Sequence, residues 1–260
     1  MSRGADSSAP AATSGALRQR LIPGLVGLSV HTDCVYQHIM HERVAQIAAD
    51  GRRVSRLKAL LCSLDFAELV DHTRAQRWEL AEQQIAVAAA ALCAGGADFI
   101  VICANTGYAL TARTKTQVAL PILDIALPVC RAIRAAGLQS PGLLSTLKTE
   151  AAGVYRTQAR AHGLSLIAPS PSLADKVQKL ILEELVSGHV SEAGVEVLRS
   201  AASWFAGQGA DCVILGCTDL THLVEGVNAA GGTDVPLFDS TRLHAEAAAE
   251  LAMSGRPAAE

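Results

Sequence analysis

Short apolar segments alternate with longer, alanine-rich amphipathic segments along most of the chain. Seven apolar segments predict β-strands at residues 21–28, 57–63, 99–103, 142–146, 164–168, 212–215 and 235–238. Six stretches with helical periodicity predict α-helices at residues 31–50, 77–94, 149–161, 172–187, 191–208 and 241–253. This alternation is typical of α/β proteins with mostly parallel sheets.

The chain also contains an internal repeat. Gly-Ala-Asp, an apolar run and a cysteine follow one another at 96–103 and again at 209–217, and a predicted helix precedes each copy. An alanine-rich chain readily contains Gly-Ala-Asp twice by chance, but less readily the same strand and cysteine after it. We therefore expect an α/β fold of two similar lobes, each a mostly parallel sheet flanked by helices, related by pseudo-two-fold symmetry with the active site between them.

The repeat suggests how the chain is divided. Residues 21–125 together with 239–260 are expected to form the first lobe, and residues 126–238 the second. Residues 1–20 are rich in Ala, Ser and Gly and lack the apolar core of a signal peptide, so we expect a disordered N-terminal tail there.

Composition narrows the class of protein. Hydrophobic residues make up 50% of the chain and charged residues 18%, which is enough apolar surface for a folded core. The formal net charge of −3 lacks the basic excess with which nucleic-acid binders contact phosphates. No apolar run of about 18 residues predicts a membrane span. We expect a cytoplasmic enzyme with neither a nucleic-acid nor a membrane partner.

The 7 cysteines include no CxxC pair, so neither a disulfide framework nor a zinc site is indicated. Reduced thiols are expected. Five of them are interpreted as buried core residues: Cys34, Cys62, Cys93, Cys130 and Cys212. Cys103 and Cys217 differ from these five, because each follows a predicted strand and precedes a turn that leads into a helix.

Cys103 and Cys217 therefore lie where open α/β sheets bind ligands, beyond the carboxyl ends of the strands. A helix N-terminus at that point is expected to lower a thiol pKa from about 8.5 and favour the thiolate. Asn105, Thr106 and Thr218 add donors for a small anionic ligand. If the lobes face each other, the two thiols flank one cleft. That arrangement suits removal of a proton from one face of a carbon and its return to the other face.

Two motifs connect these residues with a known family. Ile102-Cys103-Ala104-Asn105-Thr106 together with Leu215-Gly216-Cys217-Thr218-Asp219 resembles the two cysteine motifs of the PLP-independent aspartate/glutamate racemase superfamily. The resemblance extends from about Gly24 to Met253, and includes Gly27-Leu28-Ser29, Asp65-Phe66, Leu144-Ser145-Thr146, Thr149 and the stretch 236–245. The spacing looks most similar to the branch of aspartate and broad-specificity racemases, whose first motif is Cys-x-Asn-Thr.

The resemblance implies a two-base racemase or epimerase of a small amino acid that needs no cofactor and no metal. One thiolate would take the α-proton and the opposing thiol would deliver a proton to the other face. The family holds the α-carboxylate with hydroxyls and amides, which here are Ser29, Asn105, Thr106, Thr146, Thr149 and Thr218. Family members are often dimers, so a homodimer is an open expectation.

Some positions depart from the family motifs. The stretch 28–33 lacks the usual Pro or Trp followed by Glu and places His31 in the first turn, while Gly107-Tyr108 stands where relatives have Met-His. Arg156 is a loose candidate for holding a side-chain carboxylate, and no second cation is evident. Asp219 stands where glutamate racemases have His, and like Asp65 it could orient a ligand amine or cap a helix. The motifs thus predict the proton transfer, but they do not support specificity for an amino acid with an acidic side chain.

Two other functions stay open. A relative that uses the same cysteines on another carbon acid, of the hydantoin racemase or maleate isomerase type, fits the motifs as well. A catalytically inactive ligand-binding relative is suggested by the altered first motif, although two intact cysteines count against it.

The sequence favours a metal site or a nucleotide site less than it favours the two-cysteine site. His31, His38 and His41 lie close together, but no HExxH pattern or further ligand cluster accompanies them, so we interpret them as one face of a helix. No GxGxxG or Walker-type loop predicts a nucleotide site.

Overall fold

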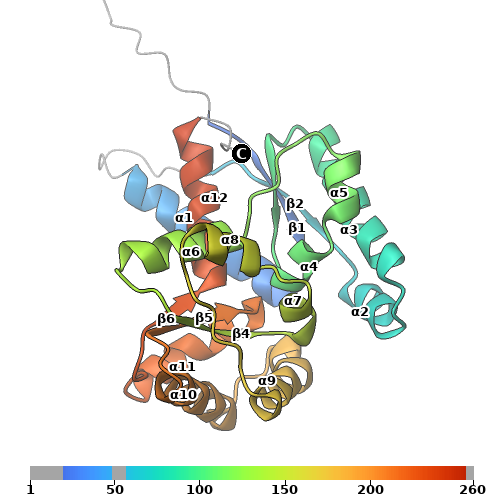
Figure 1. Cartoon of the computed structure of the whole chain (residues 1–260). Helices are drawn as coiled ribbons and strands as arrows, with labels where there is room; N and C mark the ends of the chain where they lie inside the picture. The colour runs from blue at the N-terminus through green and yellow to red at the C-terminus, as the bar shows by residue number, and fades with distance from the viewer. Residues whose placement is uncertain (1–19, 49–56, 256–260) are drawn as a thin grey trace, which may run out of the picture.

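Two parallel β-sheets organise the protein, whose computed structural model describes residues 20–48 and 57–255 (Figure 1). In the first sheet the strand order is β2-β1-β3, with β1 (Pro23–Gly27), β2 (Leu60–Ser63) and β3 (Phe99–Ile102). In the second sheet the order is β4-β5-β6, with β4 (Pro141–Ser145), β5 (Cys212–Gly216) and β6 (Leu237–Asp239). Both sheets are flanked by helices, so the predicted α/β class with parallel sheets is confirmed.

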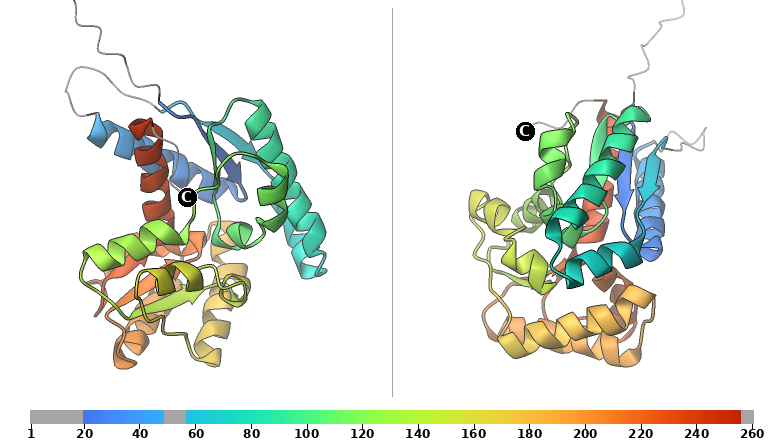
Figure 2. Two further views of the ribbon diagram at one scale, coloured as in Figure 1. Left: turned by 45° about the horizontal axis from the view of Figure 1, so that its top comes forward. Right: turned by 90° about the vertical axis from the view of Figure 1, so that its right-hand side faces the viewer.

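The helices follow the strands in chain order. Those of the first sheet are α1 (Val30–Ile47), α2 (Phe66–Arg74), α3 (Trp78–Ala94), α4 (Asn105–Ala109) and α5 (Ala112–Gln117). Those after it are α6 (Ala126–Ala135), α7 (Leu147–Ala151), α8 (Arg156–Ala161), α9 (Pro171–Glu183), α10 (Glu192–Gly207), α11 (Val224–Ala229) and α12 (Ser240–Ser254), with 3-10 helices η1 (Leu185–Ser187) and η2 (Thr218–Leu223). Helix α12 returns to the first sheet and packs beside α1 (Figure 2).

Strands β1, β3, β4 and β5 are buried on both faces, as expected for parallel strands, whereas the edge strands β2 and β6 are partly exposed. Successive residues of β3 alternate between two apolar clusters: Val101 packs with the cluster of α1 and α12, and Ile102 with the cluster of α2 and α3. Strand β5 alternates in the same way, with Ile214 facing α6 and α8, and Leu215 facing α9 and α10. Successive side chains of these buried strands therefore point to opposite faces of the sheet, and this alternation determines which apolar cluster each one joins.

The Gly-Ala-Asp repeat has the same structural task in both copies. Gly96 and Gly209 adopt φ angles of +89° and +86°, which allow the chain to turn sharply from a helix into a strand. The Asp98 carboxylate accepts a hydrogen bond from the Ile22 backbone N–H at 2.7 Å. In the second copy, Asp211 accepts from the Ser140 N–H at 3.0 Å. Each N–H lies just before a Pro-Gly-Leu strand, so the aspartates tie β1 to β3 and β4 to β5.

The strand pairing extends this symmetry. Pro23 pairs with Phe99 in the first sheet, and Pro141 pairs with Cys212 in the second. The expected pseudo-symmetry of two lobes is confirmed by this shared register and by the matching turns. The exact division into 21–125 plus 239–260 and 126–238 stays a prediction.

Three predicted elements differ in the structure. The segment 164–168 is reduced to one bridge between Gly142 and Ile167. The predicted helix 149–161 is broken into α7 and α8, with Gly153 between them at a φ of +66°. The helix predicted at 172–187 ends in η1, after which Gly188 has a φ of +77°. Gly153 separates α7 from α8, and Gly188 ends η1 after α9 has already stopped at Glu183, which the amphipathic pattern alone does not show.

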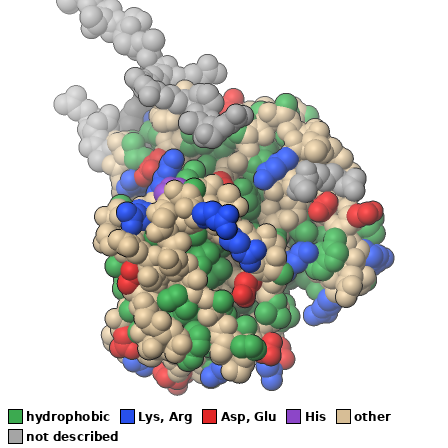
Figure 3. Space-filling model, viewed as in Figure 1, with side chains coloured by type: hydrophobic (Ala, Val, Ile, Leu, Met, Phe, Trp, Pro, Cys, Tyr) green, Lys and Arg blue, Asp and Glu red, His purple; other side chains and the backbone are tan. Residues whose placement is uncertain are grey.

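Two expectations fall partly outside the described residues, namely the tail 1–20 and the end of the helix 31–50. Three cysteines also correct the sequence interpretation, because Cys34 and Cys93 are exposed on α1 and α3 and Cys62 is half-buried on the edge strand β2. Within residues 20–48 and 57–255, no helix is both long enough and apolar enough to span a bilayer. Acidic and basic side chains are intermixed over the face drawn in Figure 3.

Candidate active site

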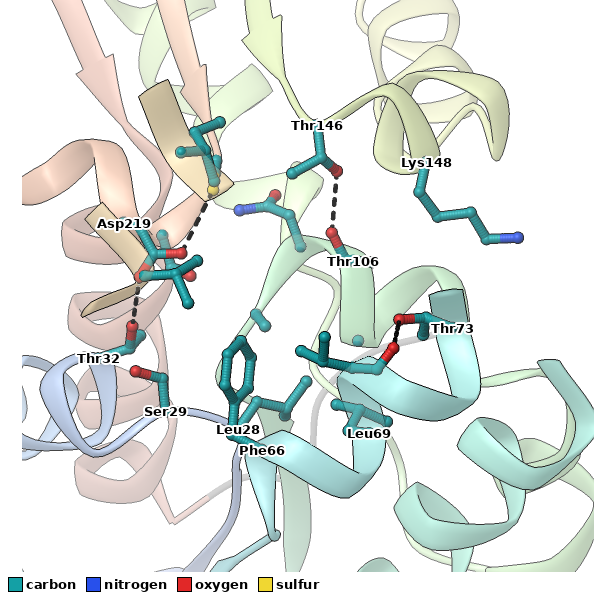
Figure 4. A pocket seen from close by; sticks show the side chains of 18 of the residues that line it. Leu28, Ser29, Thr32, Phe66, Leu69, Thr73, Thr106, Thr146, Lys148 and Asp219 are labelled. Atoms are coloured by element: carbon teal, nitrogen blue, oxygen red, sulfur yellow. Dashed lines mark hydrogen bonds between the residues drawn. The ribbon is translucent and has the colours of Figure 1, made fainter. Parts of the chain in front are cut away.

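A cavity of about 290 Å³ lies where the carboxyl ends of the two sheets approach each other. Cys103, which follows β3, and Cys217, which follows β5, both line it. Six of the other residues singled out in the sequence also line it: Ser29, Asn105, Thr106, Thr146, Thr218 and Asp219. Figure 4 shows several of these side chains directed toward a common space. Parallel strands place their carboxyl ends on one edge, which explains why residues from both halves meet here.

Three threonines connect the two halves across this cavity. The Thr106 hydroxyl, on α4, lies 2.9 Å from the Thr146 hydroxyl and 3.2 Å from that of Thr149. Thr146 also caps α7, because its hydroxyl accepts a hydrogen bond from the Thr149 backbone N–H. Thr149 is fully buried behind the cavity and does not line it. Thr106 and Thr146 therefore offer hydroxyls to a ligand, while Thr149 holds both in place.

Asn105 is held by partners that the sequence patterns did not indicate. Its amide nitrogen donates to the Ser240 hydroxyl at 2.9 Å, and its amide oxygen accepts from the Tyr155 hydroxyl at 2.7 Å. Ser240 in turn donates to the Leu215 carbonyl at 2.7 Å. These bonds join α4, α8 and α12 and fix the backbone that follows Cys103. Tyr155 and Ser240 lie 50 and 135 residues from Asn105, so no local pattern could pair them.

The Cys217 thiol has a carboxylate partner. Its Sγ donates to Asp219 Oδ2 at 3.7 Å, and the Thr32 hydroxyl donates to Asp219 Oδ1 at 3.5 Å. Burial raises the pKa of the Asp219 carboxyl above its ordinary value. Burial also raises the pKa of the Cys217 thiol well above its ordinary value, and the nearby Asp219 charge acts in the same direction.

The Cys103 thiol is fully buried, and burial raises its pKa well above the ordinary value, with the charge of Asp33 adding to the rise. Asp33 is itself buried on α1, where Ser63 donates to its Oδ2 at 2.9 Å. A Cβ at Gly27 would overlap that same oxygen, so the glycine makes room for the carboxylate. The expected lowering of both thiol pKa values by helix N-termini is therefore wrong. Helix α4 has only five residues and Cys217 precedes a 3-10 helix, so burial outweighs their dipoles.

Three further residues singled out in the sequence, His31, Tyr108 and Arg156, do not line this cavity. His31 is exposed on α1, and its ring lies edge-on to that of His222 with the two ring centroids 6.4 Å apart. Tyr108 is half-buried, with the Lys115 ammonium 5.2 Å from its ring centroid. Arg156 lines a separate cavity of about 150 Å³ beside Glu150. The sequence reasoning missed the apolar residues that line this cavity, which come mainly from α2 and α9.

The histidines and Asp65 have ordinary local partners. His38 pairs with Glu42 at 3.2 Å and His41 contacts the Gln37 carbonyl at 2.7 Å, both along α1. In the described part of the chain, no three His, Cys, Asp or Glu side chains are grouped as metal ligands. Asp65 caps α2 by accepting from the Ala67 and Glu68 backbone N–H groups, which is the capping role considered from sequence.

Comparison with known proteins places this architecture in a family. The family model described as Asp/Glu/Hydantoin racemase matches residues 37–248. The chain belongs to the Asp/Glu/hydantoin racemase family. The resemblance inferred from the two cysteine motifs is thereby confirmed, and the family is one of isomerases.

Individual relatives agree with this assignment. A crystal structure from Yersinia pestis, described as a candidate Asp/Glu racemase, is 32% identical with a TM-score of 0.77, and the match covers 89% of this chain and 99% of that one. An aspartate racemase homologue from Pyrococcus horikoshii is 25% identical with a TM-score of 0.69, over 88% and 98% of the two chains. The curated glutamate racemase of Desulforudis audaxviator is 26% identical over 151 residues, which cover 57% of this chain and 54% of that enzyme. The match thus spans little more than half the length of this curated relative.

Proposed function

We propose that the protein is a cofactor-independent racemase or epimerase of a small amino acid, in which Cys103 and Cys217 are the two catalytic bases. The observation that carries the proposal is that both thiols line one small cavity and come from the carboxyl ends of two different sheets. The Cys-x-Asn-Thr and Cys-Thr motifs and membership of a racemase family support it.

The proposed reaction moves one proton at each face of Cα. One cysteine, as thiolate, takes the α-proton, and the C–H electron pair remains on the substrate as a carbanion delocalised into the carboxylate. The other cysteine, as thiol, gives its proton to the opposite face and becomes the thiolate. The enzyme ends with the two protonation states exchanged, so the reverse enantiomer uses the cysteines in the opposite roles.

The surrounding groups support the charges of this reaction. The hydroxyls of Ser29, Thr106 and Thr146 and backbone N–H groups after each cysteine are donors for the α-carboxylate, whose negative charge grows when the proton leaves. Asp219 offers its carboxylate to the α-ammonium and keeps the Cys217 thiol oriented. Because burial raises both thiol pKa values, the substrate ammonium itself is expected to favour formation of a thiolate beside it.

Single substitution of either cysteine tests the proposal. Incubating the protein with single L-amino acids in deuterated water should show loss of the α-proton signal by NMR together with loss of optical rotation. Cys103→Ser and Cys217→Ser should each lower racemisation at least about 100-fold, the usual contribution of a general base. Cys93→Ser, on the exposed face of α3, is the matched control and should keep full activity. Full turnover in either cavity variant would exclude the two-base mechanism.

Hydantoin racemisation is the second candidate, because the matching family description includes hydantoin racemases. The same two thiols would then exchange the proton at C5 of a hydantoin ring. A cytoplasmic location and a homodimeric state stay predictions, the latter to be tested by analytical ultracentrifugation of the full chain.

A further inference from the structure

One wall of the cavity is built mainly from apolar side chains. They are Phe66, Leu69 and Val70 of α2, and Ile181, Leu182 and Val186 of α9 and η1. Thr73 and Arg74 of α2 and Gln178 of α9 are the polar residues of these helices that also line the cavity. Leu28 continues this wall next to Phe66, and Figure 4 shows both side chains facing the same space as Thr106 and Asp219. A ligand whose carboxylate is held by the hydroxyls, with its reacting carbon between the cysteines, would have this apolar wall available for its remaining substituent.

Phe66 stands out among the six apolar residues of α2, α9 and η1 because it is the aromatic one and, like Val70 and Leu182, packs in none of the apolar clusters. Leu69, one turn further along α2, is buried and belongs to the cluster beneath that helix. Phe66 is half-buried at the first position of α2 and belongs to none of the four apolar clusters found in the described part of the chain. An aromatic side chain has a large apolar area, so covering its ring with a ligand is favourable.

Cations are poorly placed to hold a side-chain carboxylate. Among the described residues that line the cavity, the cationic ones are Arg74 and Lys148. Arg74 is exposed at the end of α2, and the Lys148 ammonium lies 3.6 Å from the centre of the Trp78 ring. In Figure 4 the Lys148 side chain extends away from Asp219. A second carboxylate on the substrate would meet apolar carbon and the Asp219 charge, and burying it unpaired is costly.

We infer that the substrate has an uncharged apolar substituent on the reacting carbon, such as a branched aliphatic or aromatic side chain, and that Phe66 determines this specificity. The inference rests on the proposed function, because the cysteines fix which carbon reacts. The inference concerns the substituent on that carbon, and does not specify whether the carbon belongs to an amino acid or to a hydantoin ring.

A panel of six compounds, with the same three substituents on two kinds of head group, separates the question of the substituent from that of the head group. Leucine and phenylalanine present isobutyl and benzyl groups on an amino acid, and aspartate presents carboxymethyl. The corresponding 5-isobutyl-, 5-benzyl- and 5-carboxymethylhydantoins present the same groups on a ring. Deuterium exchange and racemisation are measured for each compound with the full chain.

The apolar compounds should have kcat/KM at least about tenfold higher than the carboxymethyl compound with the same head group, which is the discrimination a pocket gives for a small change of side chain. Preference for aspartate over leucine would overturn the inference and leave the proposed function intact. Exchange only with the apolar hydantoins would support the inference and overturn the amino-acid proposal. Exchange with no compound would overturn both.

Substitution of Phe66 tests the specificity role directly. Phe66→Ala should lower the ratio of kcat/KM for phenylalanine over aspartate about tenfold, and Phe66→Leu should restore part of it because it restores apolar area. Val87→Ala on α3, outside the cavity, removes an exposed apolar side chain and should leave the ratio unchanged. An unchanged ratio in a folded Phe66→Ala protein, judged by its circular dichroism and unfolding midpoint, would overturn the role of Phe66.

Discussion

At the scale of single residues, burial dominates the acid–base chemistry of this site. The Cys103 and Cys217 thiols are almost completely buried, and desolvation raises the pKa of each well above the ordinary range. The negative charge of Asp33 raises the pKa of Cys103 further, and the negative charge of Asp219 does the same for Cys217. The thiols are thus predominantly protonated at neutral pH, and thiolate formation is part of the energetic cost of turnover.

This predicts a rate that increases with pH. Because both thiol pKa values are raised, the thiolate fraction grows as the pH rises from neutral into the alkaline range, and kcat/KM should rise with it. Asp219→Asn removes the charge that raises the Cys217 pKa, so the rising limb should move to lower pH. The measurement is the pH dependence of α-proton exchange in both proteins. A limb that moves to higher pH in Asp219→Asn would contradict this role of the charge.

At the scale of elements, the two Gly-Ala-Asp turns act as equivalent joints between a helix and a strand. Asp211 accepts hydrogen bonds from two consecutive backbone N–H groups, those of Gln139 and Ser140. Asp98 accepts one, from Ile22, in a more exposed position. Each carboxylate thereby fixes the start of a strand, β1 or β4, whose partner strand is followed directly by a cavity cysteine.

The difference between the two turns gives a stability prediction. Asp211→Ala should lower the free energy of unfolding by about 2 kcal/mol, the usual contribution of hydrogen bonds to a charged group. Asp98→Ala, the equivalent variant in the first half, should cost less because its carboxylate has one such bond and is exposed. Urea denaturation of the three proteins checks this through the shift of the midpoint at constant slope. A larger loss in Asp98→Ala would be contrary to expectation.

At the scale of the whole molecule, two contacts at the cavity join the two halves. The hydroxyls of Thr106 and Thr146 meet across it, and Lys148 on α7 lies over the ring of Trp78 on α3. Both contacts involve residues that line the cavity. A ligand in contact with the threonines therefore touches both halves at once, so its binding is coupled to how closely they approach.

The Lys148–Trp78 contact predicts an optical signal for this coupling. In a Trp204→Phe background, Trp78 is the remaining tryptophan of the chain. Lys148→Met should change the Trp78 emission and raise the ligand dissociation constant several-fold, in line with about 1 kcal/mol for a cation–π contact. Fluorescence titration with leucine measures both effects. Unchanged emission together with unchanged affinity would show that the contact does not couple the halves.

Local sequence patterns were sufficient for the strands that carry the cysteines and for the paired motifs. Strands β3 and β5 are short, wholly apolar and bounded by Gly-Ala-Asp and a cysteine, so each is recognisable without its neighbours. The threonines and Asp219 lie within a few residues of these cysteines or in a motif of their own. Segment 164–168 lies along β4 but forms one bridge there, at Ile167, because an apolar run shows hydrophobicity and not how many of its residues pair.

The sequence by itself therefore determined the α/β class, the repeat and the cysteine pair, because these depend on side-chain periodicity over short distances. Only the tertiary structure decided the composition of the cavity. Phe66 and Ile181 are far apart in the chain, and both line the cavity because α2 and α9, which pack on different sheets, lie beside it. The thiol pKa values were decided in the same way, since burial is a property of packed elements and outweighs the local helix ends that the sequence shows.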